Sequence, residues 1–159
     1  MCIRDSGDPG TWASVVTTLV YTAGSMLPSF LLGLALALLL NATFPGRRLF
    51  RGLILLPWAV PGVLVSVLFL WLLDASYGVV NAMLRQAGLI STDIAWFTDE
   101  RTALVAVIAP TIWKSFPFFT LTILAALQAV PGELYEAAHM DGAGRWQQFR
   151  YVTLSLIHI

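Results

Sequence analysis

The sequence predicts an all-α protein that crosses a membrane several times. Of its 159 residues, 58% are hydrophobic and only 11% are charged, whereas soluble domains are typically about 45–50% apolar and about 25% charged. Long stretches carry no charged side chain, and prolines lie inside these stretches. The nine basic and nine acidic residues cancel, which argues against a partner nucleic acid. Cys2 is the single cysteine, which excludes a disulfide scaffold.

The charge-free stretches define three expected transmembrane helices. Residues 9–46 and 52–73 carry no charged side chain, and the last apolar stretch contains only Lys114. A helix needs about 20 apolar residues to cross about 30 Å of hydrocarbon. We therefore expect spans at about 11–40, 52–73 and 102–130. The alternative, a soluble helical bundle, requires a polar outer face, and the second stretch offers none.

The loops between these spans predict their orientation. Residues 41–51 contain three arginines and no acidic residue, whereas residues 74–101 contain four acidic residues and two arginines. Short cytoplasmic loops are enriched in arginine and lysine. We therefore expect residues 41–51 inside the cell, residues 74–101 outside, and the segment after the third span, 131–151, inside again.

Prolines and small residues predict how the spans bend and pack. Each proline removes a backbone donor and favours a kink. Bent helices around a cavity are one interpretation, and ordinary tolerance of proline in membrane helices is the other. The prolines concerned are Pro28, Pro57, Pro61, Pro110 and Pro117. Small side chains allow close helix contacts, and those expected there are Gly24, Ser25, Gly33, Ala35 and Ala37.

Lys114 is the only charged residue within an expected span. Such residues usually face a bundle interior or a watery path, although a lysine can also extend its long side chain to the interface. Trp113 and Phe116 lie beside it. These aromatic rings suit either stacking on a sugar or ordinary packing. The three residues are therefore candidates for a translocation path, and both alternatives stay open.

The expected outer loop contains a helical pattern. Apolar residues recur there at helical spacing, and Gly88 follows as a stop signal. We expect a short amphipathic helix at the outer interface, with Trp96 as an interfacial aromatic residue. The residues of the pattern are Val80, Met83, Leu84 and Ala87.

Catalytic chemistry is not expected. The sequence has no glycine-rich phosphate loop, no histidine and cysteine set with metal-ligand spacing, and no nucleophile–base pair. His139 and His158 are isolated. We therefore expect no catalytic, cofactor or metal site, and a conduit or scaffold rather than an enzyme.

The segment after the third span predicts two short helices joined by a tight turn. Pro131 and Gly132 end the span, and Glu136 suits the first turns of a new helix, where the helix dipole favours negative charge. Gly142 and Gly144 permit a sharp turn. One interpretation is a surface on which another protein docks, and the other is a hairpin that only anchors the bundle at the membrane surface.

This segment resembles the EAA signature of permease subunits of ATP-binding-cassette (ABC) importers. The signature residues are Glu136-Ala137-Ala138, Gly142, Val152 and Leu154. The surrounding residues resemble the sugar-importer branch, the maltose and glycerol-phosphate type. They are Gly46-Arg47-Arg48-Leu49-Phe50-Arg51, Leu56-Pro57, Gly78, Asn81, Leu84, Trp113 and Leu127-Gln128-Ala129-Val130-Pro131. The resemblance covers residues 11–154, which we expect to form a permease domain.

Two departures from the family pattern bear on the chain's extent. Ser155 follows Leu154 where the family has proline, and the chain supplies three spans where the family usually has six. We therefore expect a fragment of a six-span subunit. Residues 1–6 and 155–159 do not resemble the flanking family sequence. We expect residues 1–10 to be a non-native or disordered end and residues 155–159 to be a non-native end.

The resemblance implies the fold and partners of a type I (MetI-like) importer. Two permease subunits would form the path across the bacterial inner membrane, separate ATPase subunits would hydrolyse ATP, and an extracytoplasmic binding protein would deliver a sugar or related carbohydrate. The segment 131–151 would be the coupling loop, carrying the coupling helix that docks on an ATPase. Glu136 would supply a charge, and small residues would allow close approach and form the turn. The remaining implied coupling residues are Ala137, Ala138, Asp141, Gly142 and Ala143.

Two other functions remain as alternatives. An ion-coupled secondary transporter or channel subunit would use ionisable groups inside the membrane, and Lys114 has no acidic partner in any expected span. A membrane-embedded enzyme or anchor would need a polar cluster that the sequence does not show.

Overall fold

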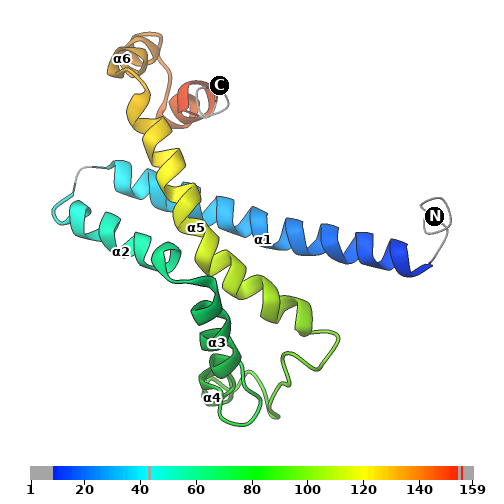
Figure 1. Ribbon diagram of the computed structural model, residues 1–159. Helices are drawn as coiled ribbons and strands as arrows, with labels where there is room; N and C mark the ends of the chain where they lie inside the picture. Colours follow the sequence, from blue (N-terminus) through cyan, green and yellow to red (C-terminus); the bar gives the residue numbers. More distant parts are fainter. Residues whose placement is uncertain (1–8, 43, 154, 156–159) are drawn as a thin grey trace. The chain divides into compact units, whose positions relative to one another are not determined.

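The computed structural model describes residues 9–42, 44–153 and 155, which form helices joined by turns and contain no strand (Figure 1). This confirms the all-α fold class. Leu154 of the expected signature, residues 1–8 and residues 156–159 lie outside the described residues. The elements are α1 (Pro9–Asn41), α2 (Arg47–Ala59), α3 (Gly62–Leu72), α4 (Val79–Gln86), α5 (Ala103–Ala129), α6 (Gly132–Met140), α7 (Arg145–Gln148) and the π-helix η2 (Phe149–Thr153).

Two helices, α1 and α5, are long and apolar enough to cross a membrane. Where a single span over residues 52–73 was expected, the structure has two helices, α2 and α3, bent by 89° at a short break. The helix cannot run through this break because Pro61 lacks an amide hydrogen and has the extended ψ of 137° at the start of α3. The pair adds a third candidate span if it is counted as one.

The chain divides into two compact units. The first comprises Met1–Ser29 and Pro57–Ser115, and the second comprises Phe30–Leu56 and Phe116–Ile159. Part of α1 and part of α5 therefore belong to each unit.

In the first unit, α1 and α5 are joined by a hydrogen bond between Tyr21 and Thr111, at 2.9 Å. The Thr111 hydroxyl donates its hydrogen to the carbonyl of Val107, at 3.0 Å, so the Tyr21 hydroxyl is the donor to Thr111. One turn further along α1, Gly24 lies against Ile108, whose Cδ1 would be 2.9 Å from an added Cβ. The expectation that small residues allow close helix contact holds here.

Hydroxyl side chains in the long helices form hydrogen bonds within their own helix. Each donates to the carbonyl four residues earlier, which satisfies the hydroxyl without a partner from another helix. In α1 these residues are Ser14, Thr17, Thr18, Ser25 and Ser29. In α5 they are Thr111, Thr120 and Thr122.

The loop between α3 and α5 is organised by Asn81, whose side chain is only 2% exposed. Its amide donates to the carbonyls of Ile94, at 3.0 Å, and Ala75, at 3.4 Å, and its oxygen accepts the indole N–H of Trp96, at 2.9 Å. The expected short helix is present as α4. Asn81 is the buried residue of α4, whereas Met83 of the expected apolar face is 63% exposed, so the placement of that face at a membrane interface stays a prediction.

The second unit has an apolar core between the C-terminal part of α1 and the C-terminal part of α5. Gly33 lies so close to α5 that an added Cβ would be 2.5 Å from the Cβ of Phe119 and 3.0 Å from the amide nitrogen of Thr120. Ala35 is exposed, so a helix contact at that position stays a prediction. The core residues are Ala37, Leu40, Ile123, Leu124 and Leu127.

Replacing Gly33 with leucine is expected to destabilise the protein by about 1–3 kcal/mol, the usual cost of overpacking, because the side chain would meet the α5 backbone. Gly52→Ala is the matched control, since no atom lies within 4 Å of the Cβ it adds. The measurement is the midpoint of thermal unfolding of the full-length permease in detergent. Equal midpoints for the two variants would contradict the close contact.

Replacing Asn81 with leucine keeps the volume but leaves the Trp96 indole N–H and the Ile94 carbonyl without a partner. Each unpaired buried group costs about 1–3 kcal/mol, so the outer loop should open. Trypsin cleavage at Arg85 and Arg101 should then be faster than in the parent, whereas Asn41→Leu, at an exposed site, should change nothing. Unchanged cleavage in the Asn81 variant would show that the loop does not depend on these bonds.

Candidate functional site

The expected coupling segment begins where α5 ends. Pro131 precedes α6 in an extended conformation, with φ −60° and ψ 134°, and no side chain caps the helix. Glu133 lies in the first turn of α6, where its carboxylate interacts favourably with the helix dipole. Proline at this position therefore separates α6 from the long helix before it.

The turn after α6 is a Schellman motif. Asp141 is the C-cap and Gly142 has φ +80°, a conformation that glycine adopts without strain. The amide of Gly142 donates to the carbonyl of His139, at 3.0 Å, and the amide of Ala143 donates to that of Ala138, at 2.9 Å. The sharp turn predicted from the glycine is confirmed, and Ala138 and Ala143 are joined through it.

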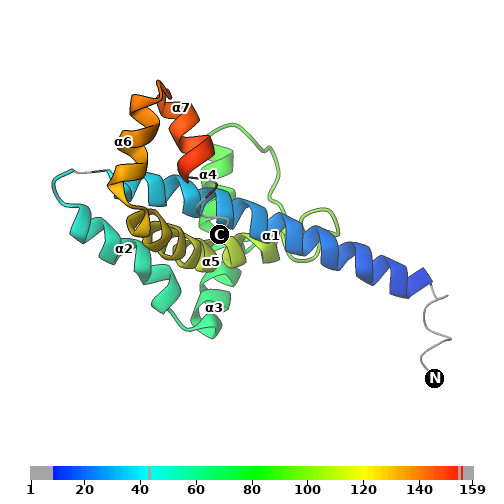
Figure 2. The same cartoon turned by 90° about the horizontal axis from the view of Figure 1, so that it is seen from above.

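Two glutamines, which the sequence analysis did not single out, hold the other side of the turn. The Gln147 side chain accepts the amide hydrogen of Gly144, at 2.9 Å, and the Gln148 side chain donates to the carbonyl of Ala143, at 3.1 Å. As a result α6 and α7 lie side by side (Figure 2). The signal in the sequence was a pair of amide side chains three to five residues after the turn, where they can reach back to it.

Most of the residues expected to couple to a partner are exposed. Glu136, Ala137, Asp141 and Gly142 are exposed, whereas Ala138 and Ala143 are partly buried. Beside Glu136 is an open cleft of about 570 Å³, which is also lined by Tyr135, His139, Met140 and Gln148. Glu136 forms no ion pair with another described residue, so its carboxylate is available to a basic group of a partner.

Two of the three candidate path residues lie in the first unit. The ring of Trp113 packs edge-on against Phe69 of α3, at 6.1 Å between ring centroids. The Lys114 amine donates to the carbonyl of Val60, at 2.6 Å, with a longer contact of 3.5 Å to that of Trp58. Phe116, the third candidate, belongs to the second unit. Lys114 therefore contacts backbone carbonyls of the broken segment.

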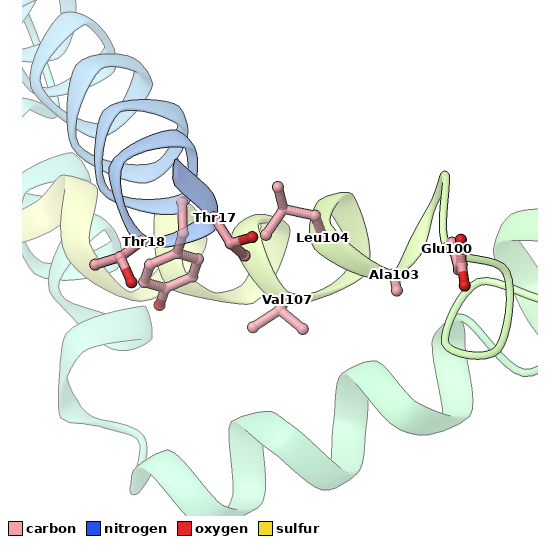
Figure 3. Close-up of a pocket in the computed structure, with 7 residues that line it drawn as sticks. Thr17, Thr18, Glu100, Ala103, Leu104 and Val107 are labelled. Carbon is pink, nitrogen blue, oxygen red and sulfur yellow. The ribbon is translucent and has the colours of Figure 1, made fainter. Parts of the chain in front are cut away.

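A further cleft of about 520 Å³ lies between the N-terminal parts of α1 and α5 in the first unit. Figure 3 shows the Thr17 hydroxyl pointing from α1 toward Leu104 of α5, with Glu100 at the turn before α5. Thr18, Tyr21, Ala103 and Val107 complete its lining. The sequence analysis did not predict this cleft, because its residues come from helices far apart in the chain.

Metal chemistry has no candidate in the described part of the chain, where no three side chains of histidine, cysteine, aspartate or glutamate are grouped to hold an ion. The candidate features are, in the first unit, the backbone contacts of Lys114 and the cleft beside Thr17 and, in the second unit, the turn after α6 and the cleft beside Glu136.

Comparison with known proteins identifies relatives over almost the whole chain. It is 36% identical over 146 residues to the trehalose/maltose transport system permease protein MalF of Thermococcus litoralis, covering 92% of this chain and 49% of that protein. It is 40% identical over 147 residues to the sulfoquinovosyl glycerol transport system permease protein SmoG of Agrobacterium fabrum, covering 92% and 46%. The chain thus spans about half the length of these relatives.

A solved structure shares the fold. The bacterial alginate ABC transporter in complex with an alginate pentasaccharide-bound periplasmic protein matches with a TM-score of 0.77 and 33% identity, over 89% of this chain and 49% of that chain. The family described as the binding-protein-dependent transport system inner membrane component matches residues 29–157. That match agrees with the apolar helices α1 and α5, which are long enough to cross a membrane. The chain belongs to this family of inner membrane components of binding-protein-dependent transport systems.

Proposed function

We propose that the chain is part of the permease subunit of an ATP-driven importer that carries a carbohydrate across the bacterial inner membrane. The observation that supports this most directly is the turn after α6: an exposed carboxylate, small residues and a glycine-dependent turn follow directly on a membrane helix. The family match supports transport that depends on a binding protein. ATP hydrolysis is assigned to separate subunits.

The partners follow from the family and from the exposed surfaces. An ATPase subunit would receive the surface formed by Glu136, Ala137 and the turn at Gly142. A second permease subunit would complete the path, and membrane lipid would cover the apolar helix faces. The alginate transporter was solved with a periplasmic binding protein, which supports a partner of that kind at the outer face.

A carbohydrate is the solute class that the relatives favour. The names of the two relatives refer to trehalose or maltose and to sulfoquinovosyl glycerol, and that of the solved transporter to alginate. Trp113, Lys114 and Phe116 lie close together along α5, and we assign them to the translocation path. Aromatic faces such as that of Trp113 suit the apolar faces of sugar rings.

The coupling role also requires a defined orientation. We assign residues 41–51 and 131–151 to the cytoplasm and residues 74–101 to the outside, because of the arginine excess in the first of these loops. Coupling to ATPase subunits then takes place at the same membrane face as the arginine-rich loop.

Single cysteines at Gln86 and Gln147 test the orientation, in a full-length permease from which Cys2 has been removed. Both positions are exposed. In whole cells an impermeant thiol reagent should label Gln86→Cys and should label Gln147→Cys only after the membrane is opened. The reverse pattern would overturn the orientation and, with it, the proposed contact to the ATPase.

Gly142→Val and Ala138→Trp test the coupling role. Valine at φ +80° is strained by about 1–3 kcal/mol, and tryptophan obstructs the surface beside the turn. Because two coupled sites act through one moving element, solute uptake and solute-stimulated ATP hydrolysis should fall together, with normal amounts of permease in the membrane. The measurement uses proteoliposomes that contain the full-length complex.

Gly144→Ala is the matched control for the coupling test. No atom lies closer than 3.8 Å to the added Cβ, and the amide hydrogen that bonds to Gln147 is retained. This control should couple like the parent. If the Gly142 and Ala138 variants also couple like the parent, residues 136–143 do not contact the ATPase. Altered membrane association with intact coupling would instead indicate an anchoring hairpin.

A further inference from the structure

The break between α2 and α3 leaves backbone carbonyls without their helical partners. Pro61 is extended, with ψ 137°, so the amides of Gly62 and Leu64 are not placed to bond to the carbonyls of Trp58 and Val60, as they would be in a continuous helix. Inside hydrocarbon no water is available to replace these donors. The carbonyls of Trp58 and Val60 therefore need donors from elsewhere in the protein.

Lys114 supplies those donors from a different helix. Its amine is 2.6 Å from the Val60 oxygen and 3.5 Å from the Trp58 oxygen, and no other described residue is recorded as a donor to either oxygen. A positive charge also interacts favourably with the C-terminal end of a helix dipole. The amine thus provides hydrogen-bond donors to the carbonyls at the end of α2, and its positive charge suits the negative end of the helix dipole.

Trp113, the residue before Lys114, contacts α3 on the other side of the break. Trp113 packs edge-on against Phe69 of α3, with 6.1 Å between ring centroids. Consecutive residues of α5 therefore contact both parts of the broken segment, Lys114 at the end of α2 and Trp113 on α3.

We propose that Lys114 is a positioning residue that caps the broken end of α2 and so sets the bend between α2 and α3. In this proposal the Lys114 amine interacts with backbone carbonyls and does not couple transport to an ion. The proposal goes beyond the proposed transport function, and it concerns the shape of the segment whatever solute is carried.

Distances between spin labels across the break test the proposal in the full-length permease without Cys2. Leu49→Cys on α2 and Leu70→Cys on α3 are suitable sites because their side chains are 67% and 50% exposed. Helix geometry places these residues about 32 Å apart in a straight helix and about 22 Å apart at a right-angled bend. The distance between the two labelled residues therefore differs by roughly 10 Å between a straight helix and a right-angled bend.

Lys114→Met should shift or broaden the distance distribution toward longer values, because the methionine side chain has no N–H to donate. Lys114→Arg, which keeps N–H donors, should preserve the parent distribution. Val105→Met, at an exposed site of α5, is the matched control and should also preserve it. A parent-like distribution for Lys114→Met would overturn the proposal, and loss of uptake with that distribution would leave Lys114 only its role in the translocation path.

Pro61→Ala provides a second, independent test of the proposal. Alanine lets the helix continue through residue 61, so the amides of Gly62 and Leu64 can bond to the Trp58 and Val60 carbonyls. Lys114→Met should therefore have much less effect in this background. If Lys114→Met alone fails to accumulate in the membrane, recovery by Pro61→Ala would support the cap. Equal effects of Lys114→Met in both backgrounds, or no recovery, would show that Lys114 does not act through the break.

Discussion

Backbone hydrogen bonding without water is the constraint on which the rest of this structure depends. In hydrocarbon a carbonyl or amide that leaves its helix must find a partner within the protein. The long helices meet this requirement internally except where Pro28, Pro110 and Pro117 remove a donor, and the break between α2 and α3 meets it only where the chain supplies a substitute. The cost of an unpaired group is consistent with the contact between Lys114, the one charged side chain within α1 or α5, and the break between the described helices α2 and α3.

Close packing of small residues is the second requirement, and it acts locally within each unit. Gly24 in the first unit and Gly33 in the second bring parts of α1 against parts of α5. Between lipid-exposed helices the hydrophobic effect contributes little, so such contacts depend on van der Waals packing. Each glycine allows a contact that even one methyl group would obstruct.

Much of this fold could be predicted from the sequence. Apolar stretches indicated α1 and α5, and Gly142 indicated the turn after α6, because length, hydropathy and glycine conformation are local properties. The partners of Lys114 could not be predicted, since they are carbonyls more than fifty residues away in the chain. Asn81 was also missed as a buried residue. Its burial depends on Trp96 and the Ile94 carbonyl, which a helical pattern within α4 does not reveal.

The hydroxyl groups of α1 and α5 have a consequence for the chemistry of any surface that they line. A serine or threonine hydroxyl has one hydrogen and two lone pairs, and in these helices the hydrogen is already bound to the carbonyl four residues earlier. Such a side chain enters hydrocarbon with its donor satisfied. What it can still offer is a lone pair, so a wall of these residues accepts hydrogens from polyols and water, and offers none to an anion.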